Sequence, residues 1–337
     1  MKNFALLLGC FFLISLPTFG HSASQSSGTI TMEFDLSEQA ANAVTKLWIP
    51  YPLSDEDQKI TNISISGDFA ESAVYSDEKY STPMLYARWE KGTKPRHLTF
   101  TFDAVRKEVV KRDFPKTEAA WNAVDYAMYL EPTSRGPIDG EVKVLSDKIV
   151  AGKTTVAAKA KAIYDWICEN MYRDPKTNGC GDGDVCSLLA VPGGKCTDIH
   201  SVFVSLARAA GVPAREIFGI RQGKKDVVDI SKWQHCWAEF LLPGYGWVPV
   251  DPADVRKMML KHDLQLSDAK TKEFRNYFWG AWDPYRVKLA VGRDIILNPA
   301  QVGAPVNTFG YPYAEVGGEK LDWLDPGKFK YTITYRK

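Results

Sequence analysis

The sequence predicts an α+β protein in which a β-rich region precedes a helical region that carries a short hairpin. Short apolar or alternating runs recur between residues 28 and 112, and turn-rich segments such as 54–57 separate them. Several short strands at this spacing are typical of a β-sandwich. From about residue 118 the apolar residues recur at helical spacing, and residues 233–252 return to a strand pattern.

The bulk composition agrees with a globular protein of about two domains. The 337 residues are 45% hydrophobic and 25% charged, and the net charge of +1 gives no reason to propose a nucleic-acid partner. The sequence does not indicate an oligomeric state. We expect four parts: a signal peptide at 1–23, a β-sandwich domain at 24–115, a catalytic core at 116–300 and a C-terminal β extension at 301–337.

The N-terminus has the pattern of a secretory signal peptide. Lys2 precedes an apolar run over residues 4–16, Pro17 ends that run, and small residues follow it. No later segment approaches the roughly 20 apolar residues that a membrane span needs. We therefore expect a secreted or periplasmic protein with no membrane span after signal removal, and a retained N-terminal anchor is the alternative.

Four runs define the β-rich region. Residues 29–34 and 97–102 alternate between apolar and polar, and residues 46–50 and 61–65 are short apolar-rich runs. No chemistry is concentrated in these runs, so we expect a structural or substrate-presenting module here.

A first helix is expected over residues 153–168, where apolar side chains recur at helical spacing. A loop rich in glycine and aspartate follows at 177–184. Five cysteines remain after signal removal, namely Cys168, Cys180, Cys186, Cys196 and Cys236. An odd count in an exported chain indicates one unpaired thiol.

The segment 193–211 predicts a second helix with Cys196 in its first turn, because apolar residues keep a helical rhythm and Gly211 supplies a stop signal. The unpaired N–H groups at a helix start stabilise an anion. They lower the pKa of a thiol there and can receive an oxyanion. Cys196 is therefore the candidate nucleophile, and a buried cysteine that only packs is the alternative.

Residues 233–252 predict an antiparallel hairpin. With the turn centred near residues 243–244, His235 and Asp251 are expected directly opposite each other at the open end. Opposed Cβ atoms lie about 4.5–5.5 Å apart, so the carboxylate can accept a hydrogen bond from the imidazole and fix its tautomer. Cys236 points to the other face of the strand, so it is not expected to act as the nucleophile beside His235.

Three motifs in this order resemble the transglutaminase-like family: Gly-Gly-Lys-Cys at 193–196, His-Cys-Trp-Ala-Glu at 235–239 and Gly-Trp-Val-Pro-Val-Asp-Pro at 246–252. The resemblance covers about residues 150–260 and implies a papain-like core. It also implies that Cys196 is the nucleophile, His235 the base and Asp251 the residue that orients the base. Cys236 departs from the family pattern, where alanine is more common. A β-domain ahead of the core resembles exported bacterial members.

The resemblance implies acyl transfer on peptide or carboxamide bonds through a Cys196 thioester. The Cys196 N–H and one further donor would hold the oxyanion, with Tyr172 and Trp166 as candidates for that donor. With water as acceptor the enzyme is a cysteine protease or amidase acting on a protein or peptide substrate, which is the reading we favour. A lysine amine as acceptor gives a cross-linking transglutaminase, and a non-catalytic binding module that kept the fold is a third possibility.

An alternative use of the same region is a metal site built from nearby thiols and imidazoles: Cys180, Cys186, Cys196, His200 and His235. Structural zinc sites usually carry a Cys-x-x-Cys pair, and the sequence has none. We therefore expect no metal and no cofactor. Of the three pairings open to the other four cysteines, Cys180 with Cys186 and Cys168 with Cys236 is one candidate.

Overall fold

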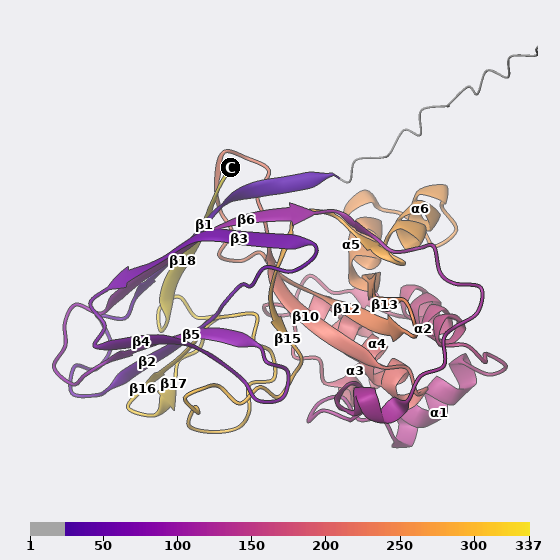
Figure 1. Cartoon of the computed structure of the whole chain (residues 1–337), viewed down its shortest axis with the longest axis horizontal. Helices are drawn as coiled ribbons and strands as arrows, with labels where there is room; N and C mark the ends of the chain where they lie inside the picture. Colours follow the sequence, from indigo (N-terminus) through magenta and orange to yellow (C-terminus); the bar gives the residue numbers. More distant parts are fainter. Residues whose placement is uncertain (1–23) are drawn as a thin grey trace, which may run out of the picture.

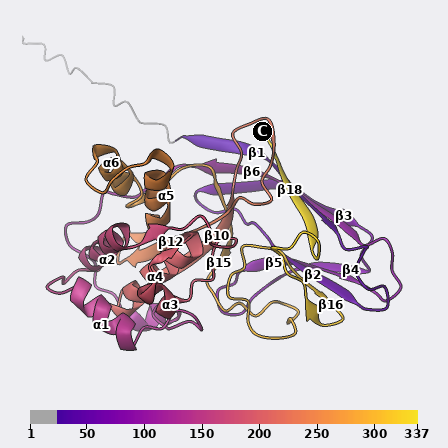
Figure 2. The same cartoon turned by 180° about the vertical axis from the view of Figure 1, so that it is seen from behind.

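The computed structural model describes residues 24–337, so the predicted signal peptide at 1–23 lies outside the described residues. Two β-sheets occupy one side of the molecule, helices occupy the other, and a third sheet lies between them (Figure 1; Figure 2 shows the same arrangement from behind). The predicted α+β class is confirmed. Within residues 24–337, none of the helices combines the length and the apolar character that a bilayer crossing requires.

The β-sandwich consists of two five-stranded antiparallel sheets. The first has the strand order β11 (Val227–Asp229), β18 (Lys330–Arg336), β1 (Gln25–Asp35), β6 (His97–Lys107) and β3 (Gln58–Gly67). The second has the order β17 (Glu319–Lys320), β16 (Tyr313–Val316), β2 (Thr45–Pro50), β5 (Pro83–Trp89) and β4 (Glu71–Ser76). The four runs predicted as strands from the sequence lie in β1, β2, β3 and β6.

The inner faces of the two sheets form one apolar core. Ile30, Met32 and Phe34 of β1 are buried and share this core with Leu47 of β2 and Trp89 of β5. The last strands of the chain complete both sheets, because β18 pairs with β1 and β16 pairs with β2. The domain boundaries expected from the sequence stay predictions.

The helical region is built on a four-stranded antiparallel sheet of order β13 (Gly246–Val250), β12 (Gln234–Leu242), β10 (Ala214–Arg221) and β15 (Arg286–Val291). Six α-helices accompany it: α1 (Gly140–Ile149), α2 (Val156–Asn170), α3 (Val185–Ala190), α4 (Cys196–Ala209), α5 (Pro252–His262) and α6 (Ala269–Tyr277). A 3₁₀ helix precedes them at Ala123–Tyr129, and two strand pairs complete the chain, β7 (Val109–Val110) with β14 (Ala281–Trp282) and β8 (Tyr172–Arg173) with β9 (Gly193–Gly194).

Helix α4 is the centre of this region, since every one of its residues is buried and it packs on β10 and β12. The two helices predicted from the sequence correspond to α2 and α4. Their apolar residues recur at helical spacing, so each helix can bury an apolar face.

The hairpin β12–β13 forms as predicted, but its predicted register is wrong. Leu242 pairs with Gly246 and Ala238 with Val250, so the turn is centred at Gly244, whereas direct pairing of His235 with Asp251 requires a centre at Pro243. Gly244 adopts φ +76°, a left-handed conformation that glycine tolerates without strain. The shift means that His235 and Asp251 are not cross-strand partners, and the ladder ends at Val250.

Candidate active site

Cys196 begins helix α4 and is 2% exposed. The turn before it is tightly packed, because a side chain at Gly194 would collide with the Asp198 carboxylate. That carboxylate accepts hydrogen bonds from the N–H of Lys195 at 2.9 Å and of Gly183 at 2.8 Å. Asp198 therefore fixes both the helix start and the preceding glycine-rich loop, a role that its sequence context did not indicate.

The same loop brings a second thiol to Cys196. Thr197 donates its backbone N–H to the carbonyl of Cys180 at 2.9 Å, and the Cys180 thiol donates to the carbonyl of Gln234 at 3.5 Å. The sulfur atoms of Cys180, Cys196 and Cys236 lie within 4.8 Å of one another. Although Cys236 points away from His235, as alternation predicts, its sulfur therefore lies beside that of Cys196.

The candidate disulfides do not form in the structure. All five cysteines of residues 24–337 are free thiols, and Cys186 is exposed. The candidate pairing of Cys180 with Cys186 is wrong because Cys180 lies against Cys196. The pairing of Cys168 with Cys236 is also wrong, since Cys236 belongs to the same three-thiol cluster.

The surroundings of Cys196 favour its thiolate. Hydrogen bonds from Cys180 and Cys236 lower the pKa of the Cys196 thiol well below its usual range, and burial only partly opposes them. A hydrogen bond from His235 and its charge lower the pKa further. Burial raises the pKa of Cys236, and the hydrogen bond with Cys196 raises that of Cys180. The cluster thus holds one thiolate and two thiols, with the negative charge on Cys196.

His235 and Asp251 are in contact despite the shifted register. The imidazole Nε2 lies 2.8 Å from the carboxylate Oδ2, and both side chains are buried. Asp251 is the N-cap of α5 and accepts the Asp254 N–H at 2.7 Å, while Pro252 occupies the first helical position. Since Nε2 contacts the carboxylate, Nδ1 is the ring nitrogen left for the Cys196 thiol.

A buried arginine that was not predicted from the sequence fixes the carboxylate of Asp251. Arg286 of β15 is fully buried and donates to Asp251, to Asp254 at 2.8 Å and to Asp283 at 3.0 Å. Burial by itself raises the pKa of Asp251, but the charges of Arg286 and His235 lower it well below the usual range. Asp251 is therefore ionised and can stabilise an imidazolium at His235.

A second histidine connects the two halves of the site. His200 Nδ1 lies 2.7 Å from the backbone carbonyl of Cys196, one turn earlier in α4. Its Nε2 lies 3.2 Å from Asp251 Oδ1, although the two are not aligned for a hydrogen bond. His200 is fully buried between the helix that carries the thiol and the start of α5, which carries the carboxylate.

The structure does not bring together the five residues considered as metal ligands. Cys186 is exposed on α3, and His200 lies between Cys196 and Asp251, so the five candidate ligands do not converge. The donor groups that do converge among the described residues are the three thiols and the set His235, Asp251 and Asp254. Arg286 pairs with both carboxylates of the second set, and Arg221 pairs with Asp254 as well.

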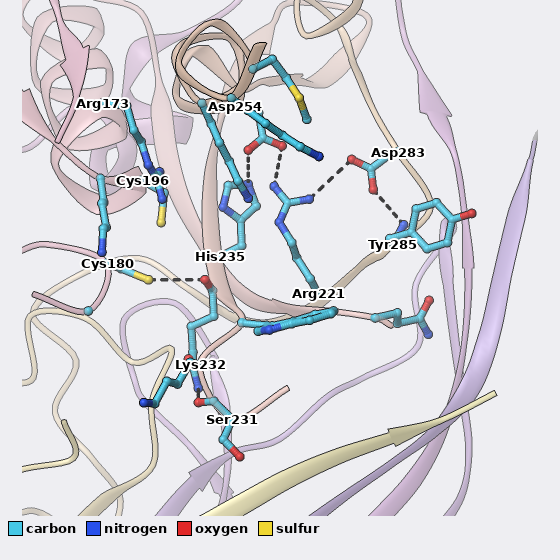
Figure 3. A pocket seen from close by; sticks show the side chains of 18 of the residues that line it. Arg173, Cys180, Cys196, Arg221, Ser231, Lys232, His235, Asp254, Asp283 and Tyr285 are labelled. Atoms are coloured by element: carbon cyan, nitrogen blue, oxygen red, sulfur yellow. Dashed lines mark hydrogen bonds and ion pairs between the residues drawn. The ribbon is translucent and has the colours of Figure 1, made fainter. Parts of the chain in front are cut away.

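The thiol and the imidazole open into a cleft of about 1610 Å³. Figure 3 shows Cys180, Cys196 and His235 on its wall, with Arg173 and Arg221 on either side. The C-terminal segment closes the far wall with Trp323, Phe329 and Tyr331. Neither of the candidate oxyanion donors, Tyr172 and Trp166, lines this cleft, and Trp166 instead packs on the helical core.

Comparison with known proteins identifies the family of this chain. Residues 143–252 match the model of the transglutaminase-like superfamily. An uncharacterized protein of Haemophilus influenzae is 39% identical over 334 residues, which are 91% of this chain and 90% of that protein. The chain belongs to the transglutaminase-like superfamily.

Two more distant matches are a sequence relative and a solved structure. YebA, an uncharacterized protein of Bacillus subtilis, is 26% identical over 125 residues, which are 33% of this chain and 17% of YebA. The crystal structure of a candidate cysteine protease from Cytophaga hutchinsonii superposes with a TM-score of 0.55 at 19% identity and covers 94% of this chain and 100% of that one. The resemblance identified from three motifs is therefore confirmed, together with the papain-like core and the β-sandwich ahead of it.

Proposed function

We propose that this protein is a thiol hydrolase that cleaves peptide or carboxamide bonds through a thioester on Cys196. The observation that carries the proposal is a buried cysteine of lowered pKa at a helix start, next to a histidine whose Nε2 lies 2.8 Å from a buried carboxylate. Such a set supplies a nucleophile, a base and an orienting group within bonding reach.

Cys196, His235 and Asp251 each have a defined role in the proposed reaction. The Cys196 thiolate attacks the carbonyl carbon and forms a C–S bond, and the carbonyl oxygen becomes an oxyanion that N–H groups at the start of α4 can hold. The imidazolium of His235 gives its Nδ1 proton to the leaving amine as the C–N bond breaks. Water then attacks the thioester carbonyl and gives a proton to Nδ1 of the now neutral His235. The C–S bond breaks, the acid leaves, and the Cys196 thiolate and the His235 imidazolium are restored; Asp251 stabilises the imidazolium whenever it is present.

The wide cleft favours water as the acceptor. Because the thiol opens into about 1610 Å³, water reaches a thioester on Cys196 without a second protein having to dock. Transfer to a lysine amine, which would make the protein a cross-linking transglutaminase, uses the same thioester and differs only in the acceptor.

Export is the part of the proposal that rests on the N-terminal sequence. The charged, apolar and small-residue pattern of residues 1–23 supports a secreted or periplasmic enzyme whose substrate is a protein or peptide in that compartment. The thiol chemistry would then operate where a free cysteine is open to oxidation.

A peptide library incubated in ¹⁸O-water, with and without a primary amine, tests the proposal by mass spectrometry. The wild type should release peptides that carry one ¹⁸O atom at the new carboxyl group. Replacement of Cys196 by alanine should remove this product, because no thioester can form. Amine adducts without ¹⁸O uptake would instead identify a transglutaminase.

The matched control is Cys186→Ala, which removes an exposed thiol outside the cleft. This variant should retain full turnover. Turnover that survives in the Cys196→Ala variant would show that the reaction does not pass through this thiol, and absence of any turnover or labelling in the wild type would favour a binding module.

A further inference from the structure

The positive charge of this protein is concentrated in the cleft. Ten lysine and arginine side chains line it, against four carboxylates, although the whole chain has a net charge of only +1. Arg221 is paired with Asp254 and Asp283, and Lys270 with Glu273. The other eight cations lie more than 4.0 Å from every carboxylate oxygen of residues 24–337. The cleft therefore presents an uncompensated positive field to whatever binds there.

Two of these cations flank the thiol itself. Arg173 lies in β8, whose backbone pairs with Gly194, two residues before Cys196. Lys257 lies in α5, which packs against β8, and both side chains are partly buried on the cleft wall. Figure 3 shows Arg173 beside Cys196 at the upper end of the cleft.

The local electrostatics show that Lys257 has no adequate counter-ion. Burial lowers its pKa, the charges of Arg221 and Arg173 lower it further, and Asp254 and Cys196 only partly oppose this. Two partly buried cations that repel each other are stabilised when an anion binds between them.

We propose that the cleft binds acidic peptides and that Arg173 and Lys257 hold the carboxylate side chain nearest to the bond that Cys196 attacks. This inference rests on the proposed function for the attack, but the binding itself does not require turnover. Arg173 supplies a planar fork suited to a carboxylate, and Lys257 supplies a point charge at its second oxygen.

The distribution of charge and the lining of the cleft favour a peptide over a nucleic acid. Its excess of positive charge exceeds that of the whole chain, so the rest of the molecule carries a net negative charge that would repel an extended polyanion. Aromatic side chains of the C-terminal segment line the same cleft as the thiol and offer apolar contacts to a peptide chain. Lys224, Lys225 and Lys232 also line the cleft and can meet further acidic residues.

Binding is measured by fluorescence anisotropy in the Cys196→Ala variant, which separates recognition from catalysis. Two labelled octapeptides of identical length serve as probes, one with glutamate and one with glutamine at alternate positions. The glutamate peptide should bind about tenfold more tightly, and R173Q/K257Q should remove most of this preference. Equal binding of the two peptides, or an undiminished preference in R173Q/K257Q, would overturn the proposal.

Matched controls exclude a general effect of charge or folding. K91Q/R336Q removes two exposed cations that lie outside the cleft and have no ion pair, so it should keep the preference. R173E/K257E should invert the preference towards a lysine peptide, a gain that a misfolded variant cannot give. Displacement of the glutamate peptide by an octathymidylate at lower concentration would overturn the assignment to peptides. The Cys196 turnover assay reports on the proposed function independently.

Discussion

The two sides of the candidate active site are held in place by different forces. On the carboxylate side, Asp251 is fully buried and contacts Arg286 and His235, so full charges compensate each other out of water. On the sulfur side, Cys196 is surrounded by two thiols and a backbone turn, and its charge is stabilised by weak donors and the helix start. Ion pairs therefore fix the position and charge of the Asp251 carboxylate, while weak donors leave the Cys196 thiolate able to react.

This difference has a physical basis in the chemistry each side performs. A carboxylate that only orients and stabilises should not change its charge during turnover, and a buried guanidinium with three carboxylate partners ensures that. A nucleophile has to lose its charge when it forms a bond. Weak donors such as thiols cost little to release at that moment.

The largest expected effect is on the carboxylate side. Asp251→Asn keeps the shape of the side chain but removes the charge that stabilises the His235 imidazolium and fixes its tautomer. We expect kcat/KM for peptide hydrolysis to fall about 10³- to 10⁴-fold. Glu273→Gln, which removes an exposed carboxylate at the edge of the same cleft, should change it by less than about threefold. Comparable losses in both variants would contradict the special role of Asp251.

Removal of the buried counter-ion should cost stability. Arg286→Met leaves the carboxylates of Asp251, Asp254 and Asp283 without their shared cation, and we expect the free energy of unfolding to fall by about 3–5 kcal/mol in urea titrations at neutral pH. The loss should shrink as the pH falls, because these carboxylates have lowered pKa values and their stabilising contribution disappears as they become protonated.

The matched control for Arg286 is Arg275→Met, which breaks two ion pairs with partly exposed partners. Solvent screens such pairs, so the expected loss is about 1 kcal/mol or less. If both variants lose the same amount, the buried cluster contributes no more than a surface pair.

The lowered pKa of Cys196 predicts how its reactivity depends on pH. Its thiolate persists down to the lowered pKa, so alkylation by iodoacetamide should change little between pH 8 and pH 6, whereas the rate for free cysteine falls about 100-fold. Mass spectrometry of the modified peptide measures the rate. Cys168, whose pKa burial raises to about 12, should remain unmodified throughout. A Cys196 rate that falls in parallel with free cysteine would show that the thiol is not activated.

The smallest expected effect is on the donors of the sulfur side. Cys180→Ala removes the strongest single contribution to the lowered pKa of Cys196, so alkylation of Cys196 at pH 6 should slow by roughly fivefold. Cys180→Ser, which keeps a hydroxyl donor, should retain more of the rate than alanine does. A faster reaction in the alanine variant would mean that Cys180 blocks access to Cys196 rather than stabilising its thiolate.

Several features of the site could be predicted because they depend on residues close together in the sequence. The helix start at Cys196, the hairpin that carries His235, and Asp251 followed by Pro252 are all local patterns. The exact pairing of the hairpin was mispredicted by two residues, because the position of its turn depends on the left-handed backbone at Gly244.

Other features depend on residues that the chain brings together from far apart. Nothing in the sequence around Arg286 indicates that it reaches Asp251, 35 positions earlier. Similarly, Cys180 looked like half of a small disulfide loop, and only the packing of that loop on the start of α4 places its sulfur against Cys196.

By itself the sequence determined the α+β class, the family and the three residues proposed to do the chemistry, because periodicity, caps and turn residues act over a few positions along the chain. The tertiary structure alone decided which charges and thiols surround those three residues and where the positive charge gathers. The net charge of a sequence does not say where the charged side chains lie in space. A buried ion pair or a thiol cluster forms only when separate elements pack against each other.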